Sequence, residues 1–187
     1  MSHDDIKDSF RFSRPKLGTF DVIAALQYAA VAPIVYLAEL YLLMGPLGLE
    51  LSRLGAMWGV IAAVFVIHGS RTATLKLAIF RMLGTVVGIA IMLIYLAFFP
   101  FHVIGLGACL FFGALLCRAF GRNDLVIVTL ITIAVIMVDA GNPTDQATWV
   151  NPALRFGDSL IGAVSGFLVV AVTSLVVRDK VSAGTER

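Results

Sequence analysis

Six apolar stretches, each about long enough to cross a lipid bilayer, constrain this chain more than any other feature. A spanning helix needs about 20 mostly apolar residues, because the hydrocarbon core is about 30 Å thick and each helical residue rises about 1.5 Å. We predict spanning helices over residues 22–44, 54–69, 79–98, 103–119, 125–140 and 159–177. The sequence therefore predicts an all-α membrane protein with six transmembrane helices.

The composition of the chain and the positions of its glycines and prolines agree with six separate membrane spans. Of the 187 residues, 59% are hydrophobic and 14% are charged, whereas soluble domains carry about 25% charged residues. Glycine and proline interrupt the apolar stretches at 45–48, at Pro100 and at 141–143. We expect a cytoplasmic segment over 1–20, a transmembrane module over 21–178 and a cytoplasmic tail over 179–187, with no cleavable signal peptide and no further soluble domain.

Lysine and arginine are distributed unevenly between the predicted loops. With the N-terminus in the cytoplasm, the outside loops hold only Arg53 and Arg155. The inside segments then hold the other twelve basic residues: Lys7, Arg11, Arg14, Lys16, Arg71, Lys76, Arg81, Arg118, Arg122, Arg178, Lys180 and Arg187. Basic residues collect on the cytoplasmic side of membrane proteins. We therefore expect a multi-pass inner-membrane protein with both termini in the cytoplasm.

The third and sixth predicted helices resemble each other when aligned at an offset of 74 residues. Three pairs of like residues coincide in this alignment: Arg81 with Arg155, Thr85 with Ser159, and Gly88 with Gly162. An odd number of helices in each half inserts the two halves with opposite orientations. We predict two inverted three-helix repeats, with Arg81 at the cytoplasmic start of one helix and Arg155 at the outer start of the other.

The same two helices carry glycines at four-residue spacing, Gly84 with Gly88 and Gly162 with Gly166. Small residues let helix backbones approach closely in lipid, where no hydrophobic force draws helices together. We predict that these four glycines are helix-packing positions, and tight packing alone is enough to explain them.

These residues resemble the membrane module of the fusaric acid resistance family, which is related to the bacterial aromatic acid exporters. The motifs that carry the resemblance are Met57-Trp58-Gly59 and Arg81-x-x-Gly84-Thr85-x-x-Gly88. The resemblance implies an inner-membrane efflux protein that expels aromatic carboxylic acids or other weak acids. Many members carry two six-helix modules and a soluble cytoplasmic domain in one chain. This chain has one module, and a homodimer would supply the second.

Four residues are predicted to meet the substrate: Arg81, Trp58, Arg71 and Tyr28. We expect Arg81, at a helix start, to add its charge and donors to the positive end of the helix dipole and so to bind a carboxylate. Arg71 would raise the local anion concentration. Trp58, Phe65 and Tyr28 would form aromatic walls. The alternative for the arginines is positive-inside anchoring, and the alternative for the rings is anchoring at the interface.

Four ionisable residues are predicted to couple proton movement to transport: Glu39, Asp158, Asp139 and Arg155. Glu39 lies inside the first predicted span, where a charge is costly, which makes it a candidate proton carrier. Asp158 follows Arg155 by one turn, a spacing at which opposite charges meet on one helix face. Alternatively, Glu39 reaches the interface or pairs with Arg53 or Arg155, and Asp158 caps a helix start.

The motifs that other functions need are missing from the sequence. Neither a histidine or cysteine cluster of metal-ligand spacing nor a phosphate-binding glycine loop occurs. We therefore expect no metal, no cofactor, no enzymatic activity and no nucleic-acid partner. The leading hypothesis is a homodimeric exporter of small organic anions, driven by the proton gradient. The alternative is a non-transporting membrane scaffold or accessory subunit of a larger transport complex.

Overall fold

Within the residues that the structure describes, every secondary-structure element is a helix. This computed structural model describes residues 18–141 and 150–185. The helices are α2 (Thr19–Val66), α3 (Arg71–Phe98), α4 (Val103–Ala119), α5 (Asn123–Ala140) and α6 (Val150–Thr185). The predicted cytoplasmic segment up to residue 17, the loop over 142–149 and the last two residues of the predicted tail lie outside the described residues.

Six apolar helical segments correspond to the six predicted spans. By length and composition, four can cross a membrane: Asp21–Leu42, Arg71–Phe98, Asn123–Ala140 and Val150–Leu175. Two are shorter apolar helices: Ser52–Val66 and Val103–Ala119. The predicted fold class, an all-helical membrane protein, is thus confirmed for the described part of the chain.

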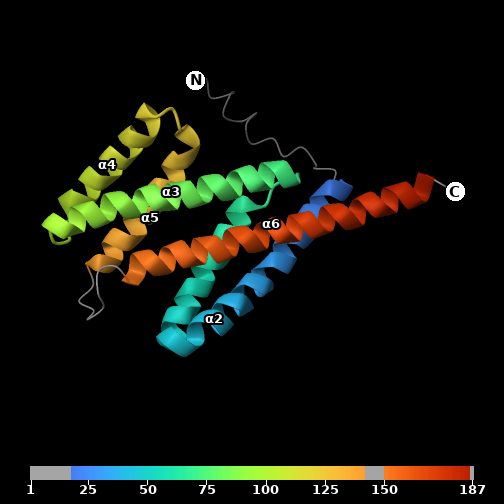
Figure 1. Ribbon diagram of the computed structural model, residues 1–187, viewed down its shortest axis with the longest axis horizontal. Coiled ribbons are helices and arrows are strands. Elements are labelled where there is room, and N and C mark those ends of the chain that lie inside the picture. The colour runs from blue at the N-terminus through green and yellow to red at the C-terminus, as the bar shows by residue number, and fades with distance from the viewer. Residues whose placement is uncertain (1–17, 142–149, 186–187) are drawn as a thin grey trace, which may run out of the picture.

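The first two predicted spans form a single helix, α2, of 48 residues. We call its apolar segments the first arm (Asp21–Leu42) and the second arm (Ser52–Val66). Between the arms, where the sequence contains Gly45, Pro46 and Gly48, the ribbon turns back on itself (Figure 1). The sequence predicts a break in the helix at this segment, and this prediction is wrong. The backbone stays helical and bends, which is how helices commonly accommodate proline and glycine.

Local chemistry explains several other helix boundaries. The Ser70 hydroxyl accepts a hydrogen bond from the backbone N–H of Ala73 at 3.2 Å and caps the start of α3. Pro100 follows α3 and favours the extended backbone that Phe99 adopts. After α4, Gly121 has a φ of 67°, in the left-handed region that glycine adopts without strain.

The predicted starts of the third and sixth helices, at residues 79 and 159, were wrong. α3 begins at Arg71 and α6 at Val150. The prediction followed hydropathy, which marks the part of a helix suited to lipid. Backbone hydrogen bonding continues through polar first turns as well, so both helices are longer than their apolar portions.

Two hydrophobic cores define two packing units within the bundle. The first core joins α2 and the residue after it to α6 through buried residues: Val31, Val35, Ala63, Ile67 and Val170. The second core joins α3, α4 and α5 through another set: Met92, Cys109, Ile133, Ile136 and Met137. We call these the α2/α6 unit and the α3/α4/α5 unit. A small third cluster of Val66, Ala78 and Ala163 links them.

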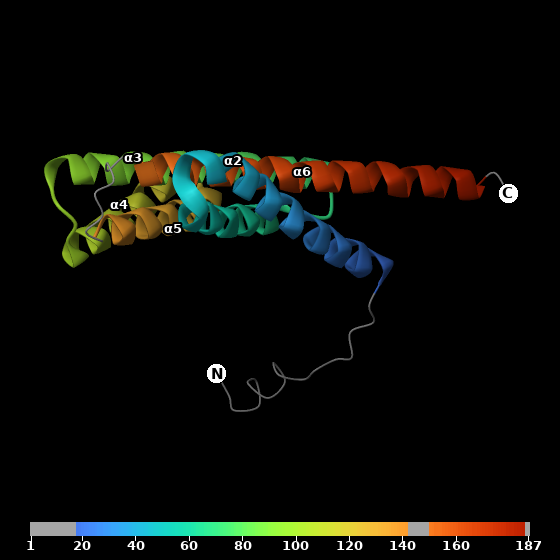
Figure 2. The same ribbon diagram turned by 90° about the horizontal axis from the view of Figure 1, so that it is seen from below.

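The two units meet where α3 and α6 run side by side in opposite directions (Figure 1). Figure 2 shows α3 and α6 in one layer, with α4, α5 and the second arm in a layer beneath them. At this contact the Thr85 and Ser159 hydroxyl oxygens lie 3.4 Å apart. These two residues are also paired in the sequence alignment at offset 74. The inverted repeat of the two halves stays a prediction.

Glycines on α3 and α6 lie at close helix contacts within each unit. Gly84 and Gly88 of α3 face α5, whereas Gly162 and Gly166 of α6 face the second arm. The closest approach is at Gly162, where an added Cβ would lie 2.3 Å from the backbone carbonyl oxygen of Gly59. Because this neighbour is backbone, it cannot rotate aside, and only a hydrogen fits there.

Substitution of Gly162 tests this packing. We expect Gly162→Ala to lower the free energy of unfolding by about 1–3 kcal/mol, because the added methyl group pushes α6 away from the second arm. Denaturant unfolding of the purified protein in detergent measures the change. Gly157→Ala is the matched control on α6, since a Cβ there meets no atom within 4 Å. Equal stability of the two variants would contradict the close approach.

Candidate functional site

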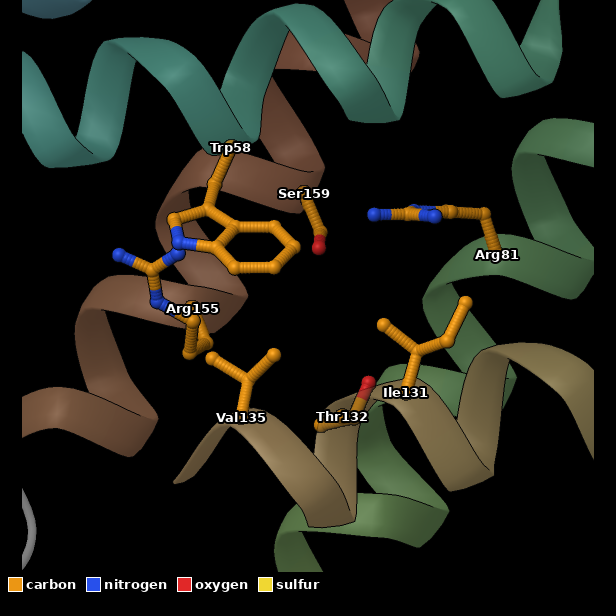
Figure 3. A pocket seen from close by; sticks show the side chains of 7 residues that line it. All are labelled: Trp58, Arg81, Ile131, Thr132, Val135, Arg155 and Ser159. Carbon is orange, nitrogen blue, oxygen red and sulfur yellow. The ribbon is translucent and has the colours of Figure 1, made fainter. Parts of the chain in front are cut away.

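A small cavity lies between the two packing units (Figure 3). The α2/α6 unit contributes Trp58, Arg155 and Ser159 to its lining, and the α3/α4/α5 unit contributes Arg81, Ile131, Thr132 and Val135. Its volume of about 20 Å³ is room for about one water molecule. The cavity therefore combines two guanidinium groups, an indole and two hydroxyls in a space from which most water is excluded.

Arg81 reaches the cavity from the interior of α3. It lies ten residues after Arg71, the first residue of that helix, so about 15 Å of helix precedes it. The expectation that Arg81 acts at a helix start, with the helix dipole, is therefore wrong. Figure 3 shows its guanidinium group extending across the cavity towards the side of Trp58 and Ser159.

The charge of Arg81 has no acidic partner among the described residues. The residue is 6% exposed, and its Nε atom has no hydrogen-bond partner. Its guanidinium carbon lies 5.3 Å from the ring centroid of Phe65 on the second arm. Such a contact contributes about 0.5–2 kcal/mol, whereas removing a charge from water costs several kcal/mol. The contact with the Phe65 ring is therefore too weak to offset the cost of burying the Arg81 charge. A bound anion would offset this cost.

Arg155 reaches the cavity from α6 and carries its own counter-charge. Its Nη2 atom lies 2.9 Å from Oδ2 of Asp158, one turn further along the helix, at the spacing considered in the sequence. The Trp58 ring lies against the guanidinium group, with 5.1 Å from its carbon to the ring centroid. α6 begins at Val150, so Arg155 lies within the helix and its predicted position at a helix start is wrong. For the same reason Asp158 does not cap the start of α6. Figure 3 shows Arg155 and Arg81 on opposite sides of the cavity.

Glu39 is fully buried on the first arm. It lies against Gly59 of the second arm, where an added Cβ would be 2.6 Å from Oε1. Neither of its carboxylate oxygens has a hydrogen-bond partner in the described part of the chain. Full burial excludes the alternative that Glu39 reaches the interface. Glu39 does not line the cavity, yet its charge acts on Arg155 and Asp158.

Asp139 lies at the edge of this ionisable group. It is half-buried at the end of α5, accepts a hydrogen bond from the Asn151 side chain, and exerts its charge on Arg155. Over the described ranges, the structure places no three His, Cys, Asp or Glu side chains so that they could hold a metal ion. Three acidic residues, Asp158, Asp139 and Glu39, thus act on the Arg155 guanidinium group.

Two predicted substrate residues lie away from the cavity. Arg71 donates a hydrogen bond from Nη2 to the carbonyl oxygen of Ala171 at 2.8 Å and another from Nε to the Ser174 hydroxyl. These bonds tie the start of α3 to α6, which is a structural task. Tyr28 is exposed on the first arm and does not line the cavity.

Two lining residues, Thr132 and Ser159, are not among the substrate residues predicted from the sequence. Thr132 follows Thr129 by three residues, and both are buried on α5. The Thr129 hydroxyl donates a hydrogen bond to the carbonyl oxygen of Gly84 at 3.2 Å. Two threonines on one face of an otherwise apolar span were the available signal that this face of α5 meets α3.

The Arg155–Asp158 ion pair can be tested by removing one partner and then both. We expect Asp158→Ala to lower the free energy of unfolding by about 3–5 kcal/mol, because Arg155 is left buried without its counter-charge. The double variant with Arg155→Leu and Asp158→Leu is expected to regain most of that loss. Denaturant unfolding in detergent provides the values. A double variant as unstable as Asp158→Ala would show that the pair is not the source of the loss.

Comparison with protein families gives a match that includes the whole cavity lining. The family described as fusaric acid resistance protein-like matches residues 47–169, which contain all seven lining residues, whereas Glu39 precedes the matched segment. Neither the search of curated proteins nor the search of solved structures gave a match. Because the matched segment covers more than half of the chain, this protein belongs to the fusaric acid resistance protein-like family.

Proposed function

We propose that this protein exports small organic anions across the membrane and binds the anion at Arg81. Membership of the family supports a membrane transporter with an efflux role. The observation that carries the proposal is the Arg81 guanidinium group, which is buried, lacks an acidic partner in the described part of the chain and lines a cavity. A charge inside a membrane protein is costly and marks a functional group.

The anion is an aromatic carboxylate or another weak acid. A guanidinium group binds a carboxylate through two parallel hydrogen bonds. The Thr132 and Ser159 hydroxyls lie beside it as further polar contacts, and the indole of Trp58 offers a face for an aromatic ring. These lining groups support the substrate class that the family resemblance implied.

Transport requires the two packing units to separate. A cavity with room for about one water molecule is too small for an aromatic acid. Each unit has its own hydrophobic core, and the cavity lies between the units. The α2/α6 unit therefore rocks against the α3/α4/α5 unit, opening the cavity first towards the cytoplasm and then towards the outside.

The protein lies in the inner membrane with both termini in the cytoplasm, and it works as a homodimer. Arg81 and Arg155 line an interior cavity, so neither counts as a loop charge. The remaining basic residues divide eleven to one in favour of this orientation. A dimer supplies the second six-helix module that many family members carry in one chain. Glu39 and Asp158, with Arg155 and Asp139 beside them, couple proton movement to export.

Substitution of Arg81 tests the anion site. We expect Arg81→Gln to reduce the uptake of radiolabelled benzoate into inside-out vesicles by at least about tenfold, because one charge-assisted contact is lost. The matched control is Arg118→Gln, which removes an exposed arginine from the last turn of α4. Equal loss in both variants would contradict a specific role for Arg81. No transport by the wild-type protein would favour the alternative of an accessory subunit.

A disulfide between the units tests the rocking motion. In a variant whose two native cysteines are replaced, Thr85→Cys and Ser159→Cys place two thiols where hydroxyls now lie 3.4 Å apart, a distance that a disulfide can bridge. Oxidation is expected to stop export, and reduction is expected to restore it. Each single cysteine variant serves as the control. Full export by the oxidised double variant would refute a separation of the units at this contact.

A further inference from the structure

Four buried ionisable side chains share the region of the cavity. Arg81 and Arg155 line it, and Asp158 is paired with Arg155. Glu39 lies against Gly59, next to Trp58 in the chain, and its charge acts on the ion pair. Exposure is 6% for Arg81, 7% for Arg155, 1% for Asp158 and 0% for Glu39. Because water reaches these groups so little, their total charge decides which ions the site accepts.

Among the described side chains, the charges that act on Glu39 are those of Arg155 and Asp158. The second arm has one charged residue, Arg53, which is exposed. α6 presents Arg155 and Asp158. From α5, Asp139 acts on Arg155, but it is half-exposed at the helix end, where water reduces its effect. The charge balance of the buried site therefore depends on the four residues named above.

That balance changes with the proton on Glu39. When Glu39 is ionised, two guanidinium groups and two carboxylates sum to zero, and an anion at Arg81 leaves an excess negative charge. When Glu39 is protonated, one positive charge is in excess, and a monovalent anion neutralises it. Interactions between unit charges are strong where water is excluded. Binding of the anion and protonation of Glu39 therefore favour each other, and the effect is reciprocal.

We infer that one proton on Glu39 accompanies each monovalent anion bound at Arg81. The inference rests on the proposed function and adds the direction of proton movement. The proton and the anion cross the membrane in the same direction. Such a cycle moves no net charge. Export then follows the combined concentration gradients of anion and proton, and the membrane potential does not drive it. This differs from the expectation that the inward proton gradient drives export.

Benzoate binding to the purified full-length protein in detergent tests the inference. The measurement runs between about pH 6 and pH 8, where a free carboxylic acid is ionised. We expect the affinity for radiolabelled benzoate to fall by up to about tenfold per pH unit as the pH rises. In weakly buffered solution with a pH indicator, we expect the uptake of about one proton per benzoate bound.

Two variants identify the group that takes up the proton. Glu39→Gln resembles the protonated side chain, so its benzoate affinity should not change with pH and its proton uptake should be lost. The matched control is Asp124→Asn, which removes an exposed carboxylate at the start of α5 and should behave as the wild type. If Glu39→Gln does not fold, Glu39→Asp keeps a carboxyl group and should keep the proton uptake.

The possible results separate the inference from the proposed function. Benzoate binding by the wild type that releases protons, or that exchanges none, would overturn the inference and leave the anion site standing. Unchanged proton uptake in Glu39→Gln would overturn the assignment to Glu39. Absence of benzoate binding at every pH in the range would refute the proposed function for aromatic carboxylates, and the inference with it.

Discussion

Two arginines within the apolar helices have to be kept away from lipid, and the arrangement of the bundle depends on this constraint. Arg81 lies inside α3 and Arg155 inside α6, and both turn towards one cavity between the packing units. A guanidinium group facing the hydrocarbon core would cost several kcal/mol. The helices enclose both groups by approaching closely at glycines such as Gly162, while many large apolar side chains of α3 and α6 are exposed.

The apolar segments were predictable from hydropathy, because transfer into lipid is a property of each stretch by itself. The helix Val103–Ala119 coincides with its predicted range. The helix starts were less predictable, because a helix can begin with polar residues that precede its apolar portion. This is why α3 begins at Arg71, and why Arg81 lies in a helix interior instead of at a helix terminus.

The candidate site was predictable only where its contacts are local. Arg155 and Asp158 are one turn apart on one helix, and their pairing follows from the helical repeat. Arg81, Trp58 and Thr132 come from three different helices. Their convergence depends on which helices pack together, and the apolar surfaces of six similar helical segments carry little information about which segments will be neighbours. Thr129 and Thr132 mark one face of α5, but two hydroxyls in an apolar span do not indicate which helix that face contacts.

The composition of the packing units has a consequence for biosynthesis. α3, from the first half of the chain, joins the core of α4 and α5, whereas α6, from the second half, joins α2. A nascent chain released from the ribosome without α6 would leave Ala62, Ala63 and the backbone of Gly59 facing lipid instead of Gly162 and Gly166. The hydrophobic core of the α2/α6 unit can therefore form only after the last helix has been translated, although α2 is among the first to leave the ribosome.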